Sequence, residues 1–212
     1  MFKDELIIIR HARSKHNIRE SECMDDGISD FGIRQAKNLG IFLESDFDLS
    51  RHAFYTSPFL RCLQTVSEIV KVSSSLIVPK VFPFIREYIN HSGREVWVPN
   101  RKDLYPDMNW SYYPDDGETY DEEFNEVFLH RIHDAYHRLE DKSVVITHGL
   151  PALLLLHMAS EPSVSHVPIW DYSLDNASIS VIKKGRVVWH GRNLYHEYDF
   201  NPENYRKDWT VK

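Results

Sequence analysis

The stretch from residue 6 to residue 11 constrains the fold of this chain more than any other. Residues 6–9 are an unbroken run of branched apolar side chains, which stops at Arg10 and His11 and is followed by a polar turn. A short run of this kind predicts a buried strand. In an open parallel α/β sheet, ligands bind beyond the carboxyl ends of the strands. We therefore expect Arg10 and His11 at the floor of a site.

The next segments predict two further strand-to-helix junctions. An apolar period near 3.6 residues predicts a helix over 29–45, and a short strand over 51–56 leads into a second helix with Pro58 at its first position. Arg61 falls in the first turn of that helix, where free N–H groups and the helix dipole favour an anion. A further strand is expected over 76–82, with Glu87 just past its end.

Residues 88–118 are irregular and rich in aromatic side chains, which indicates an inserted cap at about 90–118 rather than a linker. Thr119 and Glu122 have the spacing of a capping box and predict the start of a long helix that ends near residue 140. Its predicted apolar face carries Phe124, Val127, Phe128, Arg131, Ile132, Ala135 and Leu139. Stacking on nucleic acid is the alternative use of the cap aromatics. The aspartates around them favour a packed cap core instead.

A third buried strand over 143–147 ends at His148 and Gly149 and precedes a buried helix over 150–158. An antiparallel hairpin is expected from 177–183 and 187–190, with Lys184 and Gly185 at its turn. Junctions near 10, 57 and 147 thus deliver cationic or polar side chains to one edge of one sheet. These elements predict a three-layer α/β/α fold with a mostly parallel central sheet, and one domain over 1–212.

The composition narrows the class of partner and the location. A net charge of -7 argues against general binding to nucleic acid or acidic membranes, which depend on clustered basic charge. Cys23 and Cys62 occur in unrelated contexts, which favours a reducing compartment. No apolar run approaches the roughly 20 residues that span a bilayer, and the first apolar run is too short for a signal peptide. We expect a cytoplasmic protein.

The expected site residues suit phosphate chemistry. Arg10, Arg61, His11 and His148 bring positive charge and forked hydrogen-bond donors together in an acidic protein, which fits a phosphoryl group. A neutral imidazole among arginines can attack phosphorus directly. Glu87 is the candidate proton donor to the leaving oxygen, but Asp115, Asp116 and Glu118 form a second acidic loop that stays open as a source.

Four motifs in this order resemble those of the histidine phosphatase superfamily, which includes the phosphoglycerate mutases. They are Arg10-His11 with Ser14 and Asn17, then Ser57 with Arg61, Gln64 and Thr65, then Glu87 after Arg86, and finally His148-Gly149. Ala12 stands where the family usually has glycine. The resemblance implies a phosphoglycerate mutase-like fold, a phosphohistidine at His11, and no need for a metal or another cofactor.

Several assignments have competing interpretations. Ser14 and Asn17 either bind the phosphate or cap a turn through their own backbone. In the cap, Arg94 and Arg101, together with Lys102, either read a second anionic group of the substrate or pair with nearby acids in a solvated loop. Three histidines on the long helix have the spacing of metal ligands, but a solvated polar face explains them better: His130, His133 and His137.

The predicted function is that of a phosphomonoester hydrolase of the histidine acid phosphatase type, acting on a small phosphorylated metabolite or nucleotide. A phosphoglycerate-type mutase is the alternative enzyme. Mutases of the family carry Arg-His-Tyr-Gly just after the catalytic glutamate, whereas residues 88–91 here read Tyr-Ile-Asn-His, which favours water as the acceptor. A catalytically silent module that binds a phosphorylated ligand is the third possibility, and fold analogy alone does not exclude it.

Overall fold

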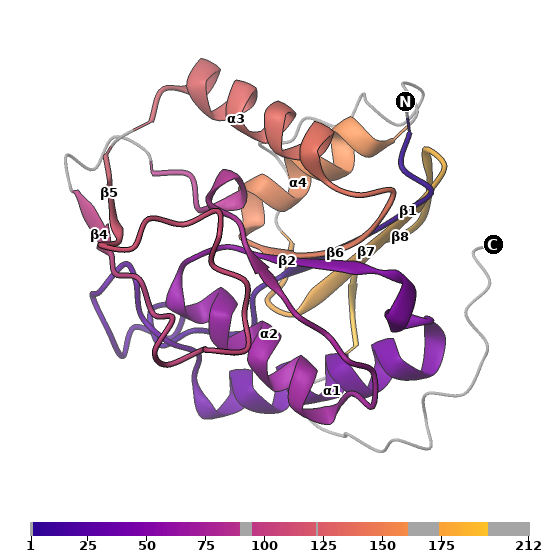
Figure 1. The fold of residues 1–212 in the computed structure, drawn as a ribbon, viewed down its shortest axis with the longest axis horizontal. Coiled ribbons are helices and arrows are strands. Elements are labelled where there is room, and N and C mark those ends of the chain that lie inside the picture. The colour runs from indigo at the N-terminus through magenta and orange to yellow at the C-terminus, as the bar shows by residue number, and fades with distance from the viewer. Residues whose placement is uncertain (1, 90–94, 122, 161–173, 195–212) are drawn as a thin grey trace.

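A six-stranded sheet lies between two layers of helices in the computed structural model, which describes residues 2–89, 95–121, 123–160 and 174–194 (Figure 1). The strand order is β3-β2-β6-β1-β7-β8, in which β1, β6, β2 and β3 run parallel and β7 and β8 run antiparallel. Helices α1 and α2 cover one face, and α3 and α4 cover the other. The predicted three-layer α/β/α fold is confirmed. The strands of the sheet are β1 (Glu5–Arg10), β2 (Ala53–Thr56), β3 (Lys80–Val81), β6 (Lys142–Thr147), β7 (Ser178–Lys183) and β8 (Arg186–Asn193).

Strand β1 lies in the middle of the sheet and fills both cores. Ile7 and Ile9 belong to the core beneath α1 (Asp30–Asp46) and α2 (Leu60–Val72), while Leu6 and Ile8 belong to the core beneath α3 (Asn125–Arg138) and α4 (Gly149–Ala159). Successive side chains of a strand point to opposite faces, so a fully apolar run is what a strand covered on both sides requires.

The first two crossover helices begin differently. The Ser29 side chain accepts a hydrogen bond from the Gly32 N–H at 3.2 Å and caps α1. Helix α2 starts at Leu60, so the prediction that Pro58 occupies its first position is wrong. Its cap residue, Phe59, has no side-chain acceptor, and the Leu60 N–H instead donates to Asp25 Oδ1 from a distant loop at 2.7 Å. Arg61 still falls in the first turn.

The strand predicted over 76–82 is much shorter in the structure, where β3 consists of Lys80–Val81. Leu76 and Val78 are exposed, and Pro79 has no N–H to donate to a ladder. Asn109 covers the outer side of β3 through hydrogen bonds with Val81 and Pro79. A 3₁₀ turn, η2 (Pro83–Ile85), follows at once and carries the chain toward Glu87.

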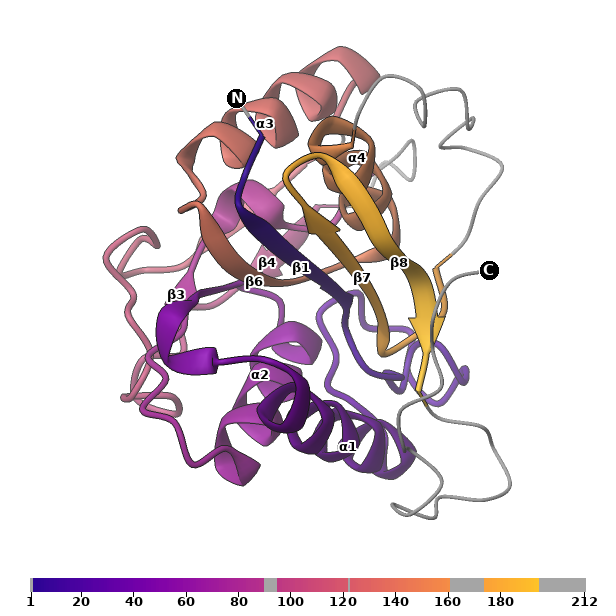
Figure 2. The ribbon, with the colours of Figure 1, turned by 90° about the vertical axis from the view of Figure 1, so that its right-hand side faces the viewer.

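The C-terminal hairpin matches its prediction. Strands β7 and β8 pair antiparallel, and β7 also pairs with β1, so the hairpin extends the sheet on the side away from β3 (Figure 2). Lys184 and Gly185 both adopt positive φ angles at the turn, of 50° and 81°. Such angles suit a tight two-residue connection between twisted strands.

The inserted segment contains a small hairpin of β4 (Val96–Val98) and β5 (Glu118–Tyr120). Thr119 therefore lies in a strand, and the predicted capping box is wrong because cross-strand pairing with Trp97 overrides the local motif. Helix α3 begins only at Asn125. Its first apolar residues, Phe124 and Val127, are exposed, contrary to the predicted apolar face.

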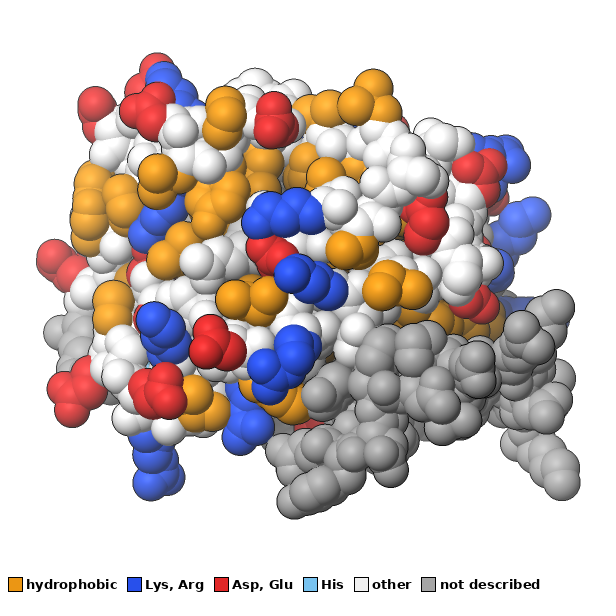
Figure 3. Space-filling view, turned by 90° about the horizontal axis from the view of Figure 1, so that it is seen from below, with side chains coloured by type: hydrophobic (Ala, Val, Ile, Leu, Met, Phe, Trp, Pro, Cys, Tyr) orange, Lys and Arg blue, Asp and Glu red, His pale blue; other side chains and the backbone are white. Residues whose placement is uncertain are grey.

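The face formed by α1 and α2 carries basic and acidic side chains interspersed with apolar ones (Figure 3). This is the polar outer side of two helices whose inner sides supply the core. Within the described ranges, no helix has the length and apolar character needed to cross a bilayer.

Candidate active site

The parallel strands bring three polar residues to one edge of the sheet. His11 follows β1, Ser57 follows β2 and His148 follows β6. Main-chain hydrogen bonds continue the ladder past the strand ends, from His11 N to Thr147 O at 2.8 Å and from Ser57 N to Ile146 O at 3.0 Å. The side chains at this edge are therefore placed by the register of the sheet itself.

His11 is buried, and its hydrogen bonds define its tautomer. Nδ1 lies 2.8 Å from the Ala12 carbonyl, to which it must donate, while Nε2 accepts from Arg61 Nε at 3.2 Å. Burial, and then the charges of the Arg61 and Arg10 guanidinium groups, hold the pKa of His11 well below its ordinary value of 6.5. Nε2 is consequently an unprotonated nitrogen facing the site.

Arg61 connects three parts of the site. Its Nε donates to His11, its Nη1 to the Met24 carbonyl at 2.6 Å, and its Nη2 to Glu87 Oε2 at 3.1 Å. The guanidinium also lies over the Phe59 ring, 4.8 Å from its centroid. A buried charge needs such a set of partners, and here they fix its orientation toward the nucleophile candidate.

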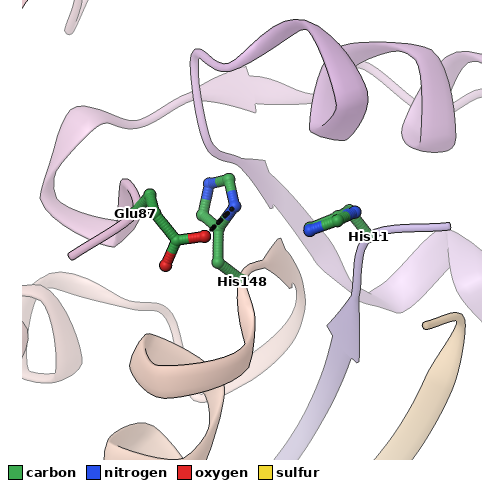
Figure 4. A group of neighbouring side chains, drawn as sticks. All are labelled: His11, Glu87 and His148. Carbon is green, nitrogen blue, oxygen red and sulfur yellow. Dashed lines mark ion pairs between the residues drawn. The ribbon is translucent and has the colours of Figure 1, made fainter. Parts of the chain in front are cut away.

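Glu87 and His148 lie side by side at ion-pair distance (Figure 4). Glu87 Oε2 is 3.2 Å from His148 Nδ1, within ion-pair distance but not in hydrogen-bond alignment. Burial lowers the pKa of His148 to about 4, although Glu87 opposes that shift. Burial alone would raise the pKa of Glu87, but His148 and Arg61 lower it overall to well below its usual range. The ligand-free site thus holds an ionised Glu87 beside a neutral His148.

Two buried nitrogens at the site make no hydrogen bond among the described residues, although one of them lies at ion-pair distance from Glu87. They are Arg10 Nε and His148 Nδ1. The other end of Arg10 is tied down, since its Nη1 donates to the Leu174 carbonyl. His148 Nε2 in turn lies 2.8 Å from Ser57 Oγ. Unsatisfied buried donors are costly, so their presence beside Arg61 indicates a place for an anion.

The same residues meet the distance requirement for a metal site. The ligand atoms of His11, Glu87 and His148 all lie within 4.8 Å of one another. Arg61 donates to two of the three, and Arg10 adds a second guanidinium whose charge contributes to the low pKa of His11. Two neighbouring guanidinium groups oppose a cation and suit a phosphate.

Ser14 and Asn17 are hydrogen bonded to each other in the loop after β1. Asn17 Oδ1 accepts from Ser14 N and Ser14 Oγ, both at 3.1 Å, and Ser14 Oγ accepts from Asn17 N at 3.2 Å. These bonds match the turn-capping interpretation, and contact with a substrate stays a prediction for both.

Gly149 begins α4, and a Cβ there would lie 3.6 Å from Arg10 Nε, an ordinary contact. Its contact with a substrate likewise stays a prediction.

The cap residues are engaged within the protein where the structure describes them. Arg101 Nη2 pairs with Asp25 Oδ2 at 2.6 Å, and Asp25 is buried whereas Arg101 is partly buried. Exposed Lys102 pairs with Asp115 at 2.8 Å. Neither acid is one of the sequence neighbours Glu95, Asp103 and Asp107, which were the expected partners in a solvated loop. Arg94 lies outside the described residues.

Four polar or aromatic residues around the site were not among the predicted site residues. Ser57 holds His148; the sequence placed it at the junction near 57 and in the second motif but assigned it no role. Asn176 donates to the His11 carbonyl at 3.2 Å and to Asn17 at 3.1 Å. It precedes an antiparallel strand, whose start lies at the same edge as the ends of its parallel neighbours. Phe59 and Asp25 act through tertiary contacts that no local pattern reveals.

The three histidines of α3 lie away from these residues, on an exposed face. His130 Nδ1 contacts the Glu126 carbonyl of its own helix, and His133 and His137 contact each other. The only cluster of three or more candidate metal ligands among the described residues is the one at the sheet edge. The exposed positions agree with a solvated polar face.

A family model decides what kind of protein carries this site. The model of the histidine phosphatase superfamily, branch 1, matches residues 6–195. The chain belongs to the histidine phosphatase superfamily. The match spans every residue described at the sheet edge, from Arg10 to Asn176. No curated protein matches the chain significantly.

Solved structures show the histidine phosphatase fold in relatives of low sequence identity. The ecdysone phosphate phosphatase of Bombix mori, in complex with tungstate, is 14% identical, with 98% of each chain covered and a TM-score of 0.70. The alpha-ribazole phosphatase of Shigella flexneri is 19% identical, with 84% of this chain and 90% of that chain covered and a TM-score of 0.55. At these identities the likeness establishes the fold. Membership of the superfamily itself supports a phosphatase, a hydrolase of phosphate esters.

Proposed function

We propose that this protein is a phosphomonoester hydrolase that acts through a phosphohistidine at His11, without a metal, on a small phosphorylated metabolite or nucleotide. The observation that carries the proposal is a pair of buried nitrogens without hydrogen bonds, Arg10 Nε and His148 Nδ1, at the same sheet edge as a neutral His11 whose Nε2 accepts from Arg61. A phosphoryl group supplies the acceptors that these donors lack.

In the first step, His11 Nε2 attacks phosphorus, and the P–O bond to the leaving group breaks. Arg61 shifts its Nε–H from the imidazole to a phosphoryl oxygen, while Arg10 and His148 hold the others. Phosphoryl transfer depends mainly on positioning and charge stabilisation, and fixed guanidinium groups supply both. The Nδ1–H to Ala12 bond stabilises the positive charge that develops on the imidazole.

Glu87 supplies the proton to the leaving oxygen in this proposal. It is ionised in the ligand-free site because His148 and Arg61 favour the carboxylate. The negative charge of a bound phosphoryl group offsets the positive charge of Arg61 and raises the proton affinity of Glu87, so that it takes up a proton with the substrate. In the second step the same carboxylate removes a proton from the attacking water, and inorganic phosphate leaves.

Water, rather than a second hydroxyl, is the proposed acceptor. Mutases place an arginine directly after the catalytic glutamate, and the corresponding Tyr88 here points to α3. Its ring lies 4.6 Å from the Phe128 ring, and its hydroxyl donates to Asn125 at 2.6 Å. This position therefore provides no cation to hold a second anionic group of a mutase substrate.

We further propose that residues 1–212 form one domain and that residues 90–118 cap the site. Val98, Tyr113 and Tyr120 of the inserted segment belong to the same core as Ile7 and Ile9 of β1, which supports one cooperative unit. The Phe59 ring stacks on Tyr120 and lies 5.2 Å from the His148 ring, so the segment reaches the site through Phe59.

A panel of phosphate monoesters, assayed in a chelating buffer, tests the proposal. It includes ecdysone phosphate and alpha-ribazole phosphate, because proteins of this fold act on compounds so named. We expect phosphate release from at least one compound by the wild type and none by His11→Ala. Release only with an added divalent cation, or equal release by His11→Ala, would refute the mechanism.

A further inference from the structure

Glu87 lies outside any helix or strand, and a loop must hold its carboxylate in place. It follows η2, and its only local side-chain contact is a hydrogen bond to Oε1 from the N–H of Tyr88 at 3.1 Å. The other site residues are placed by the sheet register, whereas the position of Glu87 depends on whatever fixes residues 84–89. A proton donor that is misplaced by about 1 Å can lose 10²-fold in rate, so this support has catalytic weight.

Arg131, from the buried side of α3, contacts the main chain on this loop. Its Nη1 donates to the Phe84 carbonyl at 2.8 Å and to the Arg86 carbonyl at 3.1 Å, and its Nη2 lies 3.5 Å from the carbonyl of Glu87 itself. One planar guanidinium thus reaches three carbonyls of the four-residue loop that ends at Glu87. Lysine cannot reproduce this geometry, because its ammonium is a single point on a flexible stem.

Glu123 holds the guanidinium in that orientation. Its carboxylate binds Arg131 in a bidentate fashion, with Nε to Oε1 at 2.8 Å and Nη2 to Oε2 at 2.6 Å. The side chains of Glu123 and Arg131 are 4% and 9% exposed, so the pair is desolvated and firmly oriented. The N–H of Glu123 also donates to the Ile89 carbonyl at 2.8 Å. The pair therefore holds the chain on both sides of Glu87.

We infer that Arg131 and Glu123 are positioning residues that aim the Glu87 carboxylate at the leaving oxygen of the substrate. Neither side chain hydrogen bonds to His11, Arg61 or His148, and both act on the site through the loop. The inference rests on the proposed role of Glu87 as proton donor. It gives a role in the reaction to Arg131 of α3 and to Glu123, which precedes that helix. Both residues lie outside the four sequence motifs.

A purely structural role for the pair makes a different prediction. Loss of a buried ion pair destabilises the fold, and it would lower the rate on every substrate in proportion to the loss of folded protein. Misplacement of a proton donor acts selectively. Alkyl phosphates need protonation of a strongly basic leaving oxygen, whereas an aryl phosphate such as p-nitrophenyl phosphate leaves readily without it.

The experiment compares kcat/KM for glycerol phosphate, or the best alkyl ester of the panel, with that for p-nitrophenyl phosphate. Arg131→Lys keeps the positive charge that pairs with Glu123 but loses the forked N–H groups that reach the loop carbonyls. Arg131→Met loses both the charge and the N–H groups. We expect each to lower kcat/KM about tenfold or more on the alkyl ester, and less than about threefold on the aryl ester. Ile132→Ala is the matched control, because it truncates the next buried residue of α3 and should change both substrates equally.

A double variant tests whether Arg131 acts through Glu87. In a Glu87→Gln background, Arg131→Lys should have no further effect on the alkyl ester, since the proton donor is already gone. Equal losses on both esters, no loss in either folded variant, or an additive loss in the double variant would overturn the positioning role. If Arg131→Met fails to fold, Arg131→Lys decides alone. Absence of wild-type turnover on both esters would instead refute the proposed function.

Discussion

The sheet edge and the inserted segment are assembled by different means. At the sheet edge, His11, Ser57 and His148 directly follow parallel strands, and main-chain hydrogen bonds fix each one in register with its neighbour. In the inserted segment 95–121, the regular structure is one short hairpin, and aromatic packing and ion pairs fix the rest. The topology of the sheet therefore places His11, Ser57 and His148, whereas side-chain contacts place the residues of the inserted segment.

The difference extends to charge. At the sheet edge, Arg10 Nε and His148 Nδ1 make no hydrogen bond within the described part of the chain, although His148 Nδ1 lies 3.2 Å from Glu87 Oε2. Arg101 of the inserted segment is already paired with buried Asp25, which also caps α2. The sheet edge therefore keeps hydrogen-bonding groups for a ligand, whereas Arg101 of the inserted segment is used inside the protein, where its partner Asp25 caps α2.

The largest effect is expected at the nucleophile. His11→Ala should lower kcat by about 10⁴- to 10⁶-fold, because the covalent step is lost. Rapid quench of the wild type with labelled substrate should trap acid-labile, alkali-stable label on the protein. Equal trapping of label in the variant would show that the nucleophile is not His11 at the end of β1, and the contrast between the sheet edge and the inserted segment would not hold.

The next effect concerns Glu87, the site residue that the sheet does not place. Glu87→Gln should slow turnover of an alkyl phosphate by about 10²- to 10⁴-fold and an activated aryl phosphate much less. Asp116→Asn and Glu118→Gln are the controls, since Asp116 is exposed and Glu118 lies in β5. Selective loss in either control, with Glu87→Gln near wild type, would assign the acid to the inserted segment.

The sheet edge should also make stability depend on pH. The pKa of His148 is about 4 in the fold against an ordinary 6.5, so the unfolded chain binds a proton that the folded chain does not between these values. Stability should therefore fall as pH drops from 6.5 toward 4, by on the order of 3 kcal/mol. Urea unfolding of wild type and His148→Asn measures this. The gap between the two should narrow with acid, and parallel curves would contradict the assignment.

The smallest effect on turnover is expected from the inserted segment. Because Arg101 supports Asp25 and through it the start of α2, Arg101→Ala should lower kcat/KM severalfold on alkyl and aryl esters alike, with some loss of thermal stability. A loss of kcat/KM that is confined to the best substrate would contradict this purely supporting role. That outcome would mean that Arg101 reads a second anionic group after all.

The sequence alone predicted most of the sheet because strands β1 and β6 are buried on both faces and therefore appear in the sequence as apolar runs. Strand β1, strand β6 and the hairpin of β7 and β8 lie close to their expected positions. The arginines and histidines of the site follow from the same logic, since parallel strands end at one edge. These are local signals whose structural consequence is set by topology.

The sequence failed where long-range partners override local signals. The motif at Thr119 resembles a helix start, yet pairing with Trp97 makes it a strand. Pro79 and the contacts of Asn109 shorten β3 at the edge of the sheet. Arg131 fell on the predicted apolar face of α3, and only its contacts with the carbonyls near Glu87 explain why a cation lies there. No local pattern carries that information.

Strand β1 contributes to both cores and is hydrogen bonded on both sides, to β6 and to β7. Its amides should consequently be among the slowest to exchange with solvent hydrogen, opening only when the whole domain opens. The main chain of β1, which ends next to His11, should therefore stay ordered until the whole domain unfolds. Heat or denaturant should therefore extinguish turnover at the same midpoint at which the sheet itself is lost, without an earlier phase of inactivation.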